Sequence, residues 1–494
     1  MGGWRRKTVA DAVAEGEGAA GLRKTLGAVD LTLLGVGAII GAGLFSSIAD
    51  MVTGTDAMLG AGPAVVLSYL LTAVACGFAA LCYAEIAAMV PISGSAYTYA
   101  YVAFGEVVAW IIGWDLIIEY AIGNIYVADK WGSYFQTWLN GMFGVRIPIW
   151  LTLDPQSAAA RLAEDPSLVG QFPMVGGQVV AVNAVAAGVV LAITWLLHRG
   201  VQESARANAV MVGLKLLLIA VFLGIGVFHV DPANWSPFAP NGVSGIWQGA
   251  ALGFFSYIGF DAVSTAAEET RDPQRDIPRG MIASLVICTV LYMLVAVVLT
   301  GILPVSELAK VDDPLAAAFG RIGMTGVETA MAFGAVVAMT AVLLVFQLGQ
   351  TRIFMVMARD GLLPAGIATV HPTYRTPTVA TWVTGGIVAV GCTVITPDQA
   401  IQLCNIGTLF AFVLVSFGVI ALRRLEPDRP RPFKVPGYPI TPLISAAACG
   451  MLILGLERSN WLRFVGWLAV GMVIYFAFGR RFSRLASAEP RGAP

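Results

Sequence analysis

The stretch that decides the fold reads GVGAIIGAGLF at positions 35–45, and a second one reads GFFSYIGFD at positions 253–261. Each lies in an apolar segment long enough to cross a lipid bilayer, and its glycines are expected to break the helix. A broken helix in a membrane exposes backbone polar groups, which are tolerated only where they line a cavity or bind a ligand. Two such breaks in corresponding halves of one chain predict the substrate site of a secondary transporter.

The composition is typical of a protein embedded in a membrane. Of the 494 residues, 57% are hydrophobic and only 12% are charged, whereas ordinary soluble domains carry roughly 25% charged residues. The mean hydropathy is +0.77. The formal net charge of −1 argues against a nucleic-acid partner, which requires a basic field. The sequence therefore predicts an all-α polytopic membrane protein surrounded by the lipid bilayer.

Twelve apolar segments approach or exceed the ~20 residues that a membrane-spanning helix needs. They lie at about 29–49, 63–90, 103–128, 178–197, 207–228, 244–266, 280–302, 327–356, 377–396, 400–422, 441–456 and 461–478. Spans 1–5 and 6–10 form two halves, and the first span of each half contains one of the breaks. Because five is an odd number, the second half enters the membrane from the opposite side, which makes the repeat inverted.

This pattern divides the chain into five parts. They are a cytoplasmic tail at 1–24, a first five-helix repeat at 25–228, a second at 244–422, two extra helices at 441–478 and a C-terminal tail at 479–494. Most Lys and Arg residues fall on the side of the N-terminus, so both termini are expected in the cytoplasm of a multi-pass plasma-membrane protein. No cleavable signal peptide is visible. The six cysteines lie in apolar segments without metal-ligand spacing, and we expect no metal or other cofactor.

Several motifs, in order along the chain, resemble a known family. GAIIGAGLF at 37–45 is similar to the first-helix signature of the amino acid–polyamine–organocation superfamily, and YAEIAAMVP at 83–91 with GSAYTY at 94–99 resembles its second-to-third-helix motif. Other motifs resemble its cationic amino acid transporter branch, namely WDLIIEY at 114–120, FDAVST at 260–265, GQTR at 349–352 and RDGLLP at 359–364. The resemblance covers roughly residues 25–480. It implies the leucine-transporter-like fold, with the first and sixth helices broken, and amino acid transport.

The resemblance also implies a substrate site at the two breaks. An amino acid carboxylate would bind the N–H groups of Ala42 and Gly43, which follow Gly41 at the positive end of a half-helix. Its ammonium group would be received by the carbonyl oxygens of Ile40, Phe255 and Ile258. Relatives often carry Ser or Thr at the position of Ala42, so carboxylate binding here would involve the backbone alone. The alternative interpretation of the glycines is close packing of helices through small residues.

Lys215 is the basic residue expected inside the membrane, about nine residues or ~13 Å into the fifth span. A charged lysine at that depth costs at least ~2.5–3.5 kcal/mol, and burial favours the neutral amine, which permits reversible protonation. By resemblance, its ammonium group replaces the cation that sodium-coupled relatives bind, which would make the proton the coupling ion. The alternative is a permanently charged structural lysine bonded to carbonyl groups of the broken first helix.

Two acidic residues are also expected within the membrane. Glu119 shares one helical face with Asp115, and it would gate the path, bond to the broken helices or relay protons. A neutral carboxyl group that joins two helices is an equally good interpretation of Glu119. Asp261 ends the second break and is expected to bond free N–H groups there as a cap, with direct substrate contact as the alternative.

Phe346, in the eighth span, is expected to affect which amino acid side chains the substrate pocket accepts. The family motif places it where branch members that accept long cationic side chains carry a smaller residue. A phenylalanine at this position would shorten the pocket and favour small or medium neutral amino acids.

These features predict a secondary active transporter that performs proton-coupled symport of small or medium neutral amino acids by alternating access. The alternative is an amino acid or polyamine exchanger that also accepts cationic substrates, in which Lys215 is structural. An enzyme is not expected, because the sequence contains no HExxH or GxSxG motif and no metal-ligand cluster. A channel is disfavoured because the sequence has no repeated filter motif.

Overall fold

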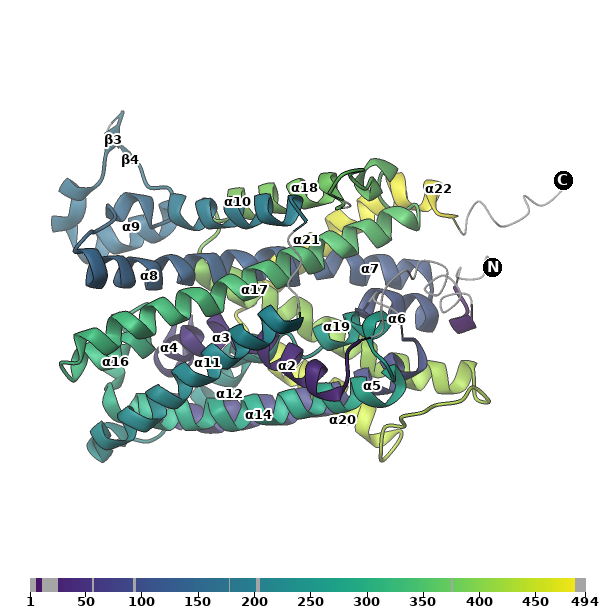
Figure 1. The fold of residues 1–494 in the computed structure, drawn as a ribbon, viewed down its shortest axis with the longest axis horizontal. Helices are drawn as coiled ribbons and strands as arrows, with labels where there is room; N and C mark the ends of the chain where they lie inside the picture. The colour runs from purple at the N-terminus through teal and green to yellow at the C-terminus, as the bar shows by residue number, and fades with distance from the viewer. Residues whose placement is uncertain are drawn as a thin grey trace.

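The computed structural model describes residues 6–10, 25–55, 57–91, 95–176, 178–200, 205–374 and 376–484. Most of the two predicted tails, at 1–5, 11–24 and 485–494, lies outside the described residues. The described part is a bundle of long helices that run mainly along one direction (Figure 1). Its strands pair in two short antiparallel hairpins, β1 (Gly54–Thr55) with β2 (Met58–Leu59) and β3 (Met174–Val175) with β4 (Gln178–Val179). The predicted all-α class is confirmed.

The first predicted span is interrupted at its glycines. It consists of α2 (Ala28–Ile39), α3 (Ala42–Phe45) and α4 (Ser47–Thr53). At the start of α2, the N–H of Gly27 donates to Oδ2 of Asp30 at 2.9 Å, which satisfies one of the donors left over at a helix N-terminus.

The sixth predicted span is interrupted as well. It consists of α12 (Gly242–Gly253), a 3₁₀ turn η7 (Phe254–Tyr257), and α13 (Ala262–Thr265), which is followed by the 3₁₀ turn η8 (Ala267–Glu269). Only one turn of α-helix therefore follows the second break, whereas the helix that precedes it has three turns.

Each remaining span is one continuous helix or a succession of helical segments. They are α5 (Val65–Met89), α6 (Ser95–Phe104), α7 (Glu106–Ile117) with the π-helical turn η2 (Ile118–Ile122) and α8 (Gly123–Phe143), α10 (Ala184–His198), α11 (Ala205–Gly226), α14 (Pro273–Ile302), α17 (Thr325–Arg359), α18 (Thr378–Gly391), α19 (Pro397–Leu425), α20 (Ile440–Leu454), and α21 (Arg458–Ile474) with the π-helical turn η10 (Tyr475–Gly479) and α22 (Arg480–Phe482). Shorter helices in the connections are α9 (Pro155–Glu164), α15 (Val305–Leu308) and α16 (Pro314–Arg321). The 3₁₀ turns of the connections are Gly62–Ala64, Ile149–Leu151, Pro166–Gln171, Val227–His229, Pro232–Trp235 and Ala365–Ala368.

In the described part of the chain, seven helices are long and apolar enough to cross a membrane. Four shorter apolar helices, α2, α10, α18 and α20, accompany them. Two predicted bounds were wrong. The third span was expected to end near residue 128, but the helix continues to Phe143 because its polar residues Asp129 and Lys130 find polar partners in Asn183 and Asp312. The fourth was expected to begin near residue 178, where the strand β4 lies instead.

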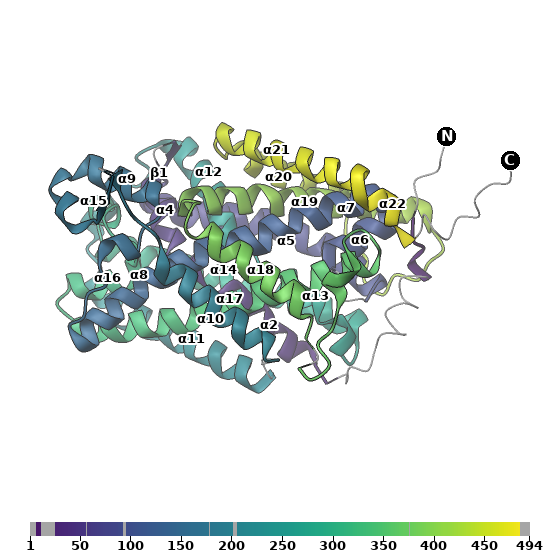
Figure 2. The ribbon, with the colours of Figure 1, turned by 90° about the horizontal axis from the view of Figure 1, so that it is seen from above.

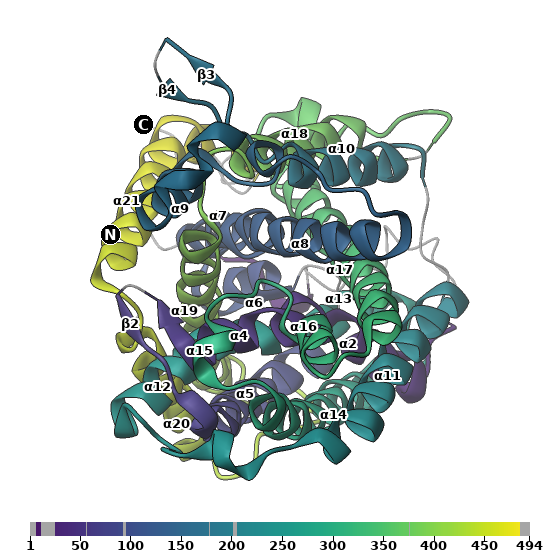
Figure 3. The same ribbon diagram turned by 90° about the vertical axis from the view of Figure 1, so that its left-hand side faces the viewer.

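The two ends of the bundle differ. At one end, which we call the terminal end, Lys7 Nζ pairs with Oδ1 of Asp360 at 2.8 Å, and the N–H of Arg484 donates to the carbonyl oxygen of the same aspartate. The opposite end, the α9 end, carries α9, α15 and α16 (Figure 2). Seen from the α9 end, α4 and α16 lie within a ring of longer helices that includes α5, α8, α11, α14 and α17 (Figure 3). The late helices α20 and α21 lie on the same side of the bundle but apart from each other (Figures 2 and 3).

Candidate substrate site

The first break exposes backbone donors. After Ile40, Gly41 has φ −159° and ψ −142°, so the helical path is lost before α3 starts. The Gly41 carbonyl accepts a hydrogen bond from the N–H of Phe45 at 3.1 Å. Within the described residues, no backbone carbonyl accepts from the N–H groups of Gly41, Ala42 or Gly43. Unpaired N–H groups at the start of a half-helix attract anions, so the first break has the chemistry of the predicted carboxylate site.

The second break exposes backbone acceptors. The N–H of Ile258 donates to the Phe255 carbonyl at 3.3 Å, and within the described residues no backbone N–H donates to the Ile258 carbonyl. Gly259 then has φ +119°, a conformation that favours glycine. A Cβ atom at Gly259 would also lie 2.9 Å from the carbonyl carbon of Ala38. The second break therefore rests directly on the last turn of α2.

The two breaks touch each other. A Cβ atom at Gly43 would lie only 2.4 Å from Cα of Ser256, so glycine is required for this approach. The Ser256 hydroxyl donates to the Gly43 carbonyl at 2.8 Å. The hydroxyl of Tyr292, on α14, lies 2.9 Å from the carbonyl oxygens of both Ile39 and Ser256. Ser256 and Tyr292 thus join the two breaks.

Sequence analysis missed both of these residues. The available signal for Tyr292 was a single phenol in the middle of an otherwise apolar span, where a hydroxyl group needs a partner. Ser256 lay inside the quoted GFFSYIGFD segment, but its partner across the breaks is 213 positions away, and no local pattern identifies such a partner.

Lys215 reaches the first broken helix. Its side chain is 1% exposed, and Nζ donates to the carbonyl oxygen of Gly37 at 2.7 Å. Gly37 lies in the last turn of α2, directly before the break. This contact links α11 to the first break, and it is compatible with either expected role of the lysine, as a proton-binding group or as a structural cation.

The predicted acidic residues lie together in the interior. Glu119 falls in the π-helical turn η2, a rare conformation that often occurs at functional sites. Its buried carboxyl group interacts electrostatically with those of Asp261 and Asp115. The Asp261 carboxylate interacts with backbone N–H groups of Gly259 and Ala262. Asp261 thus interacts with N–H groups of the break, and its role as a cap stays a prediction.

Phe346 lies on the helix that passes the first break. One turn earlier on α17, Cγ2 of Val342 lies 2.5 Å from the position that a Cβ atom at Gly41 would occupy. The Phe346 side chain is 3% exposed and packs edge-to-face against Tyr120, with ring centroids 5.8 Å apart. It also faces Gly123, where a Cβ atom would lie 3.2 Å from its ring. Phe346 therefore fills space between α17 and the η2–α8 segment.

On the side of the α9 end, a layer of polar contacts covers the breaks. The Phe255 ring packs edge-to-face on Tyr126 with centroids 4.9 Å apart, and the Tyr126 hydroxyl donates to Oδ2 of Asp50 at 2.8 Å. Nearby, Lys130 Nζ pairs with Oδ1 of Asp312 at 3.3 Å. The Lys130 ammonium group holds the pKa of Asp312 below its usual value. These contacts join α4, α8 and the segment between α15 and α16.

The described residues contain no group of three or more His, Cys, Asp or Glu side chains that could hold a metal ion.

Comparison with known proteins places this geometry in context. The family model described as amino acid permease matches residues 26–479. The branched-chain amino acid permease of Bacillus subtilis (strain 168) is 44% identical over 482 residues, which cover 98% of this chain and 98% of that protein. The methylthioribose transporter of the same organism is 43% identical, with coverage of 94% and 95%. The chloroplastic cationic amino acid transporter 9 of Arabidopsis thaliana is 38% identical, with coverage of 81% and 67%.

Proposed function

Because the chain belongs to the amino acid permease family, we propose that it performs proton-coupled symport of small or medium neutral amino acids by alternating access. The observation that carries this proposal is the direct contact between a break that offers N–H groups and a break that offers carbonyl groups. A free α-amino acid carries an anionic carboxylate and a cationic ammonium group on the same carbon atom. Donors and acceptors that face one small volume suit such a zwitterion, because each group finds partners of the opposite polarity.

In the proposed binding mode, the carboxylate accepts hydrogen bonds from the N–H groups of Ala42 and Gly43. The ammonium group donates to the carbonyl oxygens of Ile40, Phe255 and Ile258. Because Ala42 has no hydroxyl group, backbone donors alone carry the carboxylate. The side chain of the substrate would extend toward Phe346, whose buried ring limits its length.

For coupling, we assign the proton to Lys215. Its Nζ–Gly37 contact ties the ammonium group to α2, so loss of the proton would weaken the attachment of α11 to the first broken helix. A proton-dependent contact between a broken helix and its neighbour would link ion binding to helix movement. During the same transport cycle, the carboxyl groups of Glu119 and Asp261 would change their interactions at the second break.

We also propose that the substrate can reach the site from the α9 end. The Lys130–Asp312 pair and the Tyr126–Asp50 hydrogen bond close the α9 end, so opening toward that side requires these contacts to separate. We further propose the inverted five-plus-five repeat at 25–228 and 244–422, twelve crossings with the extra pair at 441–478, and cytoplasmic termini in the plasma membrane. Support comes from two breaks in corresponding spans and from Lys7 and Arg484, which meet Asp360 at one end.

An exchanger is the second candidate. The Lys215–Gly37 hydrogen bond equally suits a structural lysine, and relatives include proteins named as cationic amino acid transporters. One relative is named for methylthioribose, which has neither a carboxylate nor an ammonium group. That ligand therefore tests whether the two breaks select a zwitterion.

The deciding experiment is uptake into proteoliposomes of radiolabelled alanine, leucine, glutamate, arginine, lysine, putrescine and methylthioribose, with and without an inward proton gradient at fixed sodium. We expect the gradient to drive accumulation of alanine or leucine. Uptake that requires preloaded internal substrate and ignores the gradient would establish an exchanger. Accumulation of methylthioribose alone would contradict the proposed zwitterion site.

A further inference from the structure

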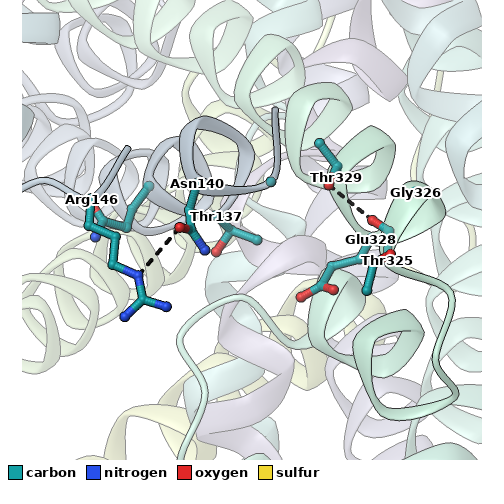
Figure 4. A pocket seen from close by; sticks show the side chains of 9 residues that line it. Thr137, Asn140, Arg146, Thr325, Gly326, Glu328 and Thr329 are labelled. Atoms are coloured by element: carbon teal, nitrogen blue, oxygen red, sulfur yellow. Dashed lines mark hydrogen bonds between the residues drawn. The ribbon is translucent and has the colours of Figure 1, made fainter. Parts of the chain in front are cut away.

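A polar cavity lies at the α9 end, apart from the two breaks. It has a volume of about 400 Å³ and is lined by residues of α8, of the segment that follows α8, and of the first turns of α17. Figure 4 shows Arg146 with Asn140 on one side of the cavity and Glu328 with Thr325 on the other. Its volume lies within the ~300–1,000 Å³ typical of small-molecule sites.

The local structure holds the cationic wall in place. Gly144 ends α8 in the left-handed conformation, with φ +66°. The Gln136 side chain then bonds both backbone groups of Ile147, accepting from its N–H at 3.2 Å and donating to its carbonyl at 3.4 Å. This clamp fixes the turn that carries Arg146, whose Nε donates to Oδ1 of Asn140 at 3.4 Å.

The opposite wall carries the negative charge. Glu328 lies in the first turn of α17. A Cβ atom at Gly320 would lie 2.9 Å from both of its carboxylate oxygens, so the glycine leaves room for the carboxylate beside α16. Within the described residues, neither Glu328 nor Arg146 forms an ion pair. The cavity thus presents one cation and one anion that do not neutralise each other.

The surroundings place the cavity at the membrane boundary. It lies where one long apolar helix segment, Glu106–Phe143, ends and another, Thr325–Arg359, begins. Phe143 is 63% exposed and Phe333 is 47% exposed, and Trp138 packs between them with centroids 5.9 and 5.6 Å away. Aromatic clusters at helix ends mark the level of lipid headgroups. Exposed apolar rings beside a polar cavity suit a ligand with a charged head and an acyl tail.

We propose that this cavity binds the headgroup of a zwitterionic phospholipid with a primary amine, such as phosphatidylethanolamine. The phosphate accepts hydrogen bonds from the Arg146 guanidinium group, which matches phosphate geometry. The ammonium group donates to the Glu328 carboxylate. The acyl chains lie against Phe143 and Phe333. A free amino acid shares the head chemistry but lacks chains to cover these exposed rings.

The test uses the full-length protein, delipidated in detergent and titrated with short-chain phosphatidylethanolamine, phosphatidylcholine or free alanine, with binding read by native mass spectrometry. The three variants are Arg146→Ala, Glu328→Gln and the control Arg463→Ala. Arg463 is a suitable control because it also donates to an asparagine, Asn460, at the start of α21. Size-exclusion chromatography establishes that each variant is folded.

We expect phosphatidylethanolamine to bind more tightly than phosphatidylcholine, whose quaternary amine has no N–H donor. Arg146→Ala should weaken both lipids about tenfold, which corresponds to the loss of one charge-assisted hydrogen bond. Glu328→Gln should reduce phosphatidylethanolamine to the level of phosphatidylcholine, and Arg463→Ala should change neither. Equal affinity for the two lipids in the unmodified protein, indifference to Arg146→Ala, or displacement of the lipid by alanine would each overturn the proposal. None of these results depends on transport.

Discussion

Each of the two breaks leaves backbone polar groups without helical partners, but the groups that remain available differ between the two breaks. At the first, the chain resumes as α3 with the N–H groups of Ala42 and Gly43 unbonded to backbone carbonyls of the described residues. At the second, the chain resumes as a single turn, α13, and the carboxyl group of Asp261 interacts with the N–H groups of the break. The first break therefore keeps its donors free, whereas the second occupies its own donors and leaves the Ile258 carbonyl available.

This difference gives the site its polarity. In the proposed binding mode only the first break supplies N–H donors for the carboxylate, so an amino acid would bind in one orientation. The comparison also separates two kinds of residue. Gly43 and Tyr292 bring the breaks together, whereas Lys215 bonds Gly37 beside the first break and Asp261 interacts with the second.

The largest effect is expected from Gly43→Ala. A methyl group there would lie 2.4 Å from backbone Cα of Ser256, and backbone cannot yield as a flexible side chain can. Uptake should fall to background while the protein remains expressed. The matched control is Gly224→Ala on α11, where a Cβ atom meets nothing within 4 Å and transport should be unchanged. Normal uptake by Gly43→Ala would mean that the close approach is not required.

Tyr292→Phe removes the hydroxyl group that both breaks share. Two buried carbonyl groups lose this donor, at a cost of ~1–3 kcal/mol, so the apparent substrate affinity should fall roughly tenfold or more. Scintillation proximity binding of labelled leucine measures this change. Another buried tyrosine, Tyr134, donates to the Phe45 carbonyl at the far end of α3 and does not bridge the two breaks, so Tyr134→Phe should have the weaker effect on binding. Equal effects of the two substitutions would contradict a special role for Tyr292.

Lys215→Ala tests the contact that links α11 to the first broken helix. If the lysine binds the coupled proton, the unmodified protein should take up more substrate as the outside becomes more acidic, and the variant should show a flat pH profile. The measurement is initial uptake between about pH 5 and 8, the range over which a proton gradient is readily imposed. A variant that folds and keeps the original pH dependence would make Lys215 structural.

Substitutions of Asp261 test the second break. If the Asp261 side chain bonds N–H groups of the break, Asp261→Ala should reduce the free energy of unfolding by about 1 kcal/mol, which would lower the melting temperature. The Asn variant keeps a hydrogen-bond acceptor and should retain uptake. If Asp261 instead contacts the substrate ammonium group, Asp261→Asn will abolish binding while the melting temperature stays near that of the unmodified protein.

The smallest change is expected from Phe346→Ser, which leaves both breaks intact and enlarges the space beside Tyr120 and Gly123. Competition by arginine and lysine against labelled leucine should improve, because longer side chains then fit. Leucine itself should bind somewhat less tightly through lost apolar contact. Unchanged competition by the cationic amino acids would show that Phe346 does not limit the substrate side chain.

A feature could be predicted from the sequence when residues close together along the chain determine it. Glycines at 41, 43 and 259 predicted both interruptions, because the loss of a helix is decided by neighbouring residues. The end of the third span could not be predicted in this way. Its continuation past Asp129 and Lys130 depends on Asn183 and Asp312, which lie far along the chain and make polar residues acceptable in a buried helix.

The site shows the same division. Lys215 was predicted to lie deep in a span, and its depth alone implied a partner, but the identity of that partner as Gly37 came from the packing of α11 on α2. Nothing near Glu119 in the sequence indicates a π-helical turn. Glu119 lies in that turn, and its carboxyl group interacts with that of Asp261, a relation that exists only in the folded bundle because the two residues are far apart along the chain.

The sequence by itself determined that this is an all-α membrane protein with two broken helices, because apolar length and glycine content act locally, and its motifs resemble the family to which the chain belongs. Only the tertiary structure decided that the breaks touch, that Ser256 and Tyr292 join them, and that Lys130 closes the α9 end through Asp312. Each of these contacts joins residues on separate elements of the fold. Their free energy arises only when packing removes both partners from lipid and water, which no stretch of sequence can do alone.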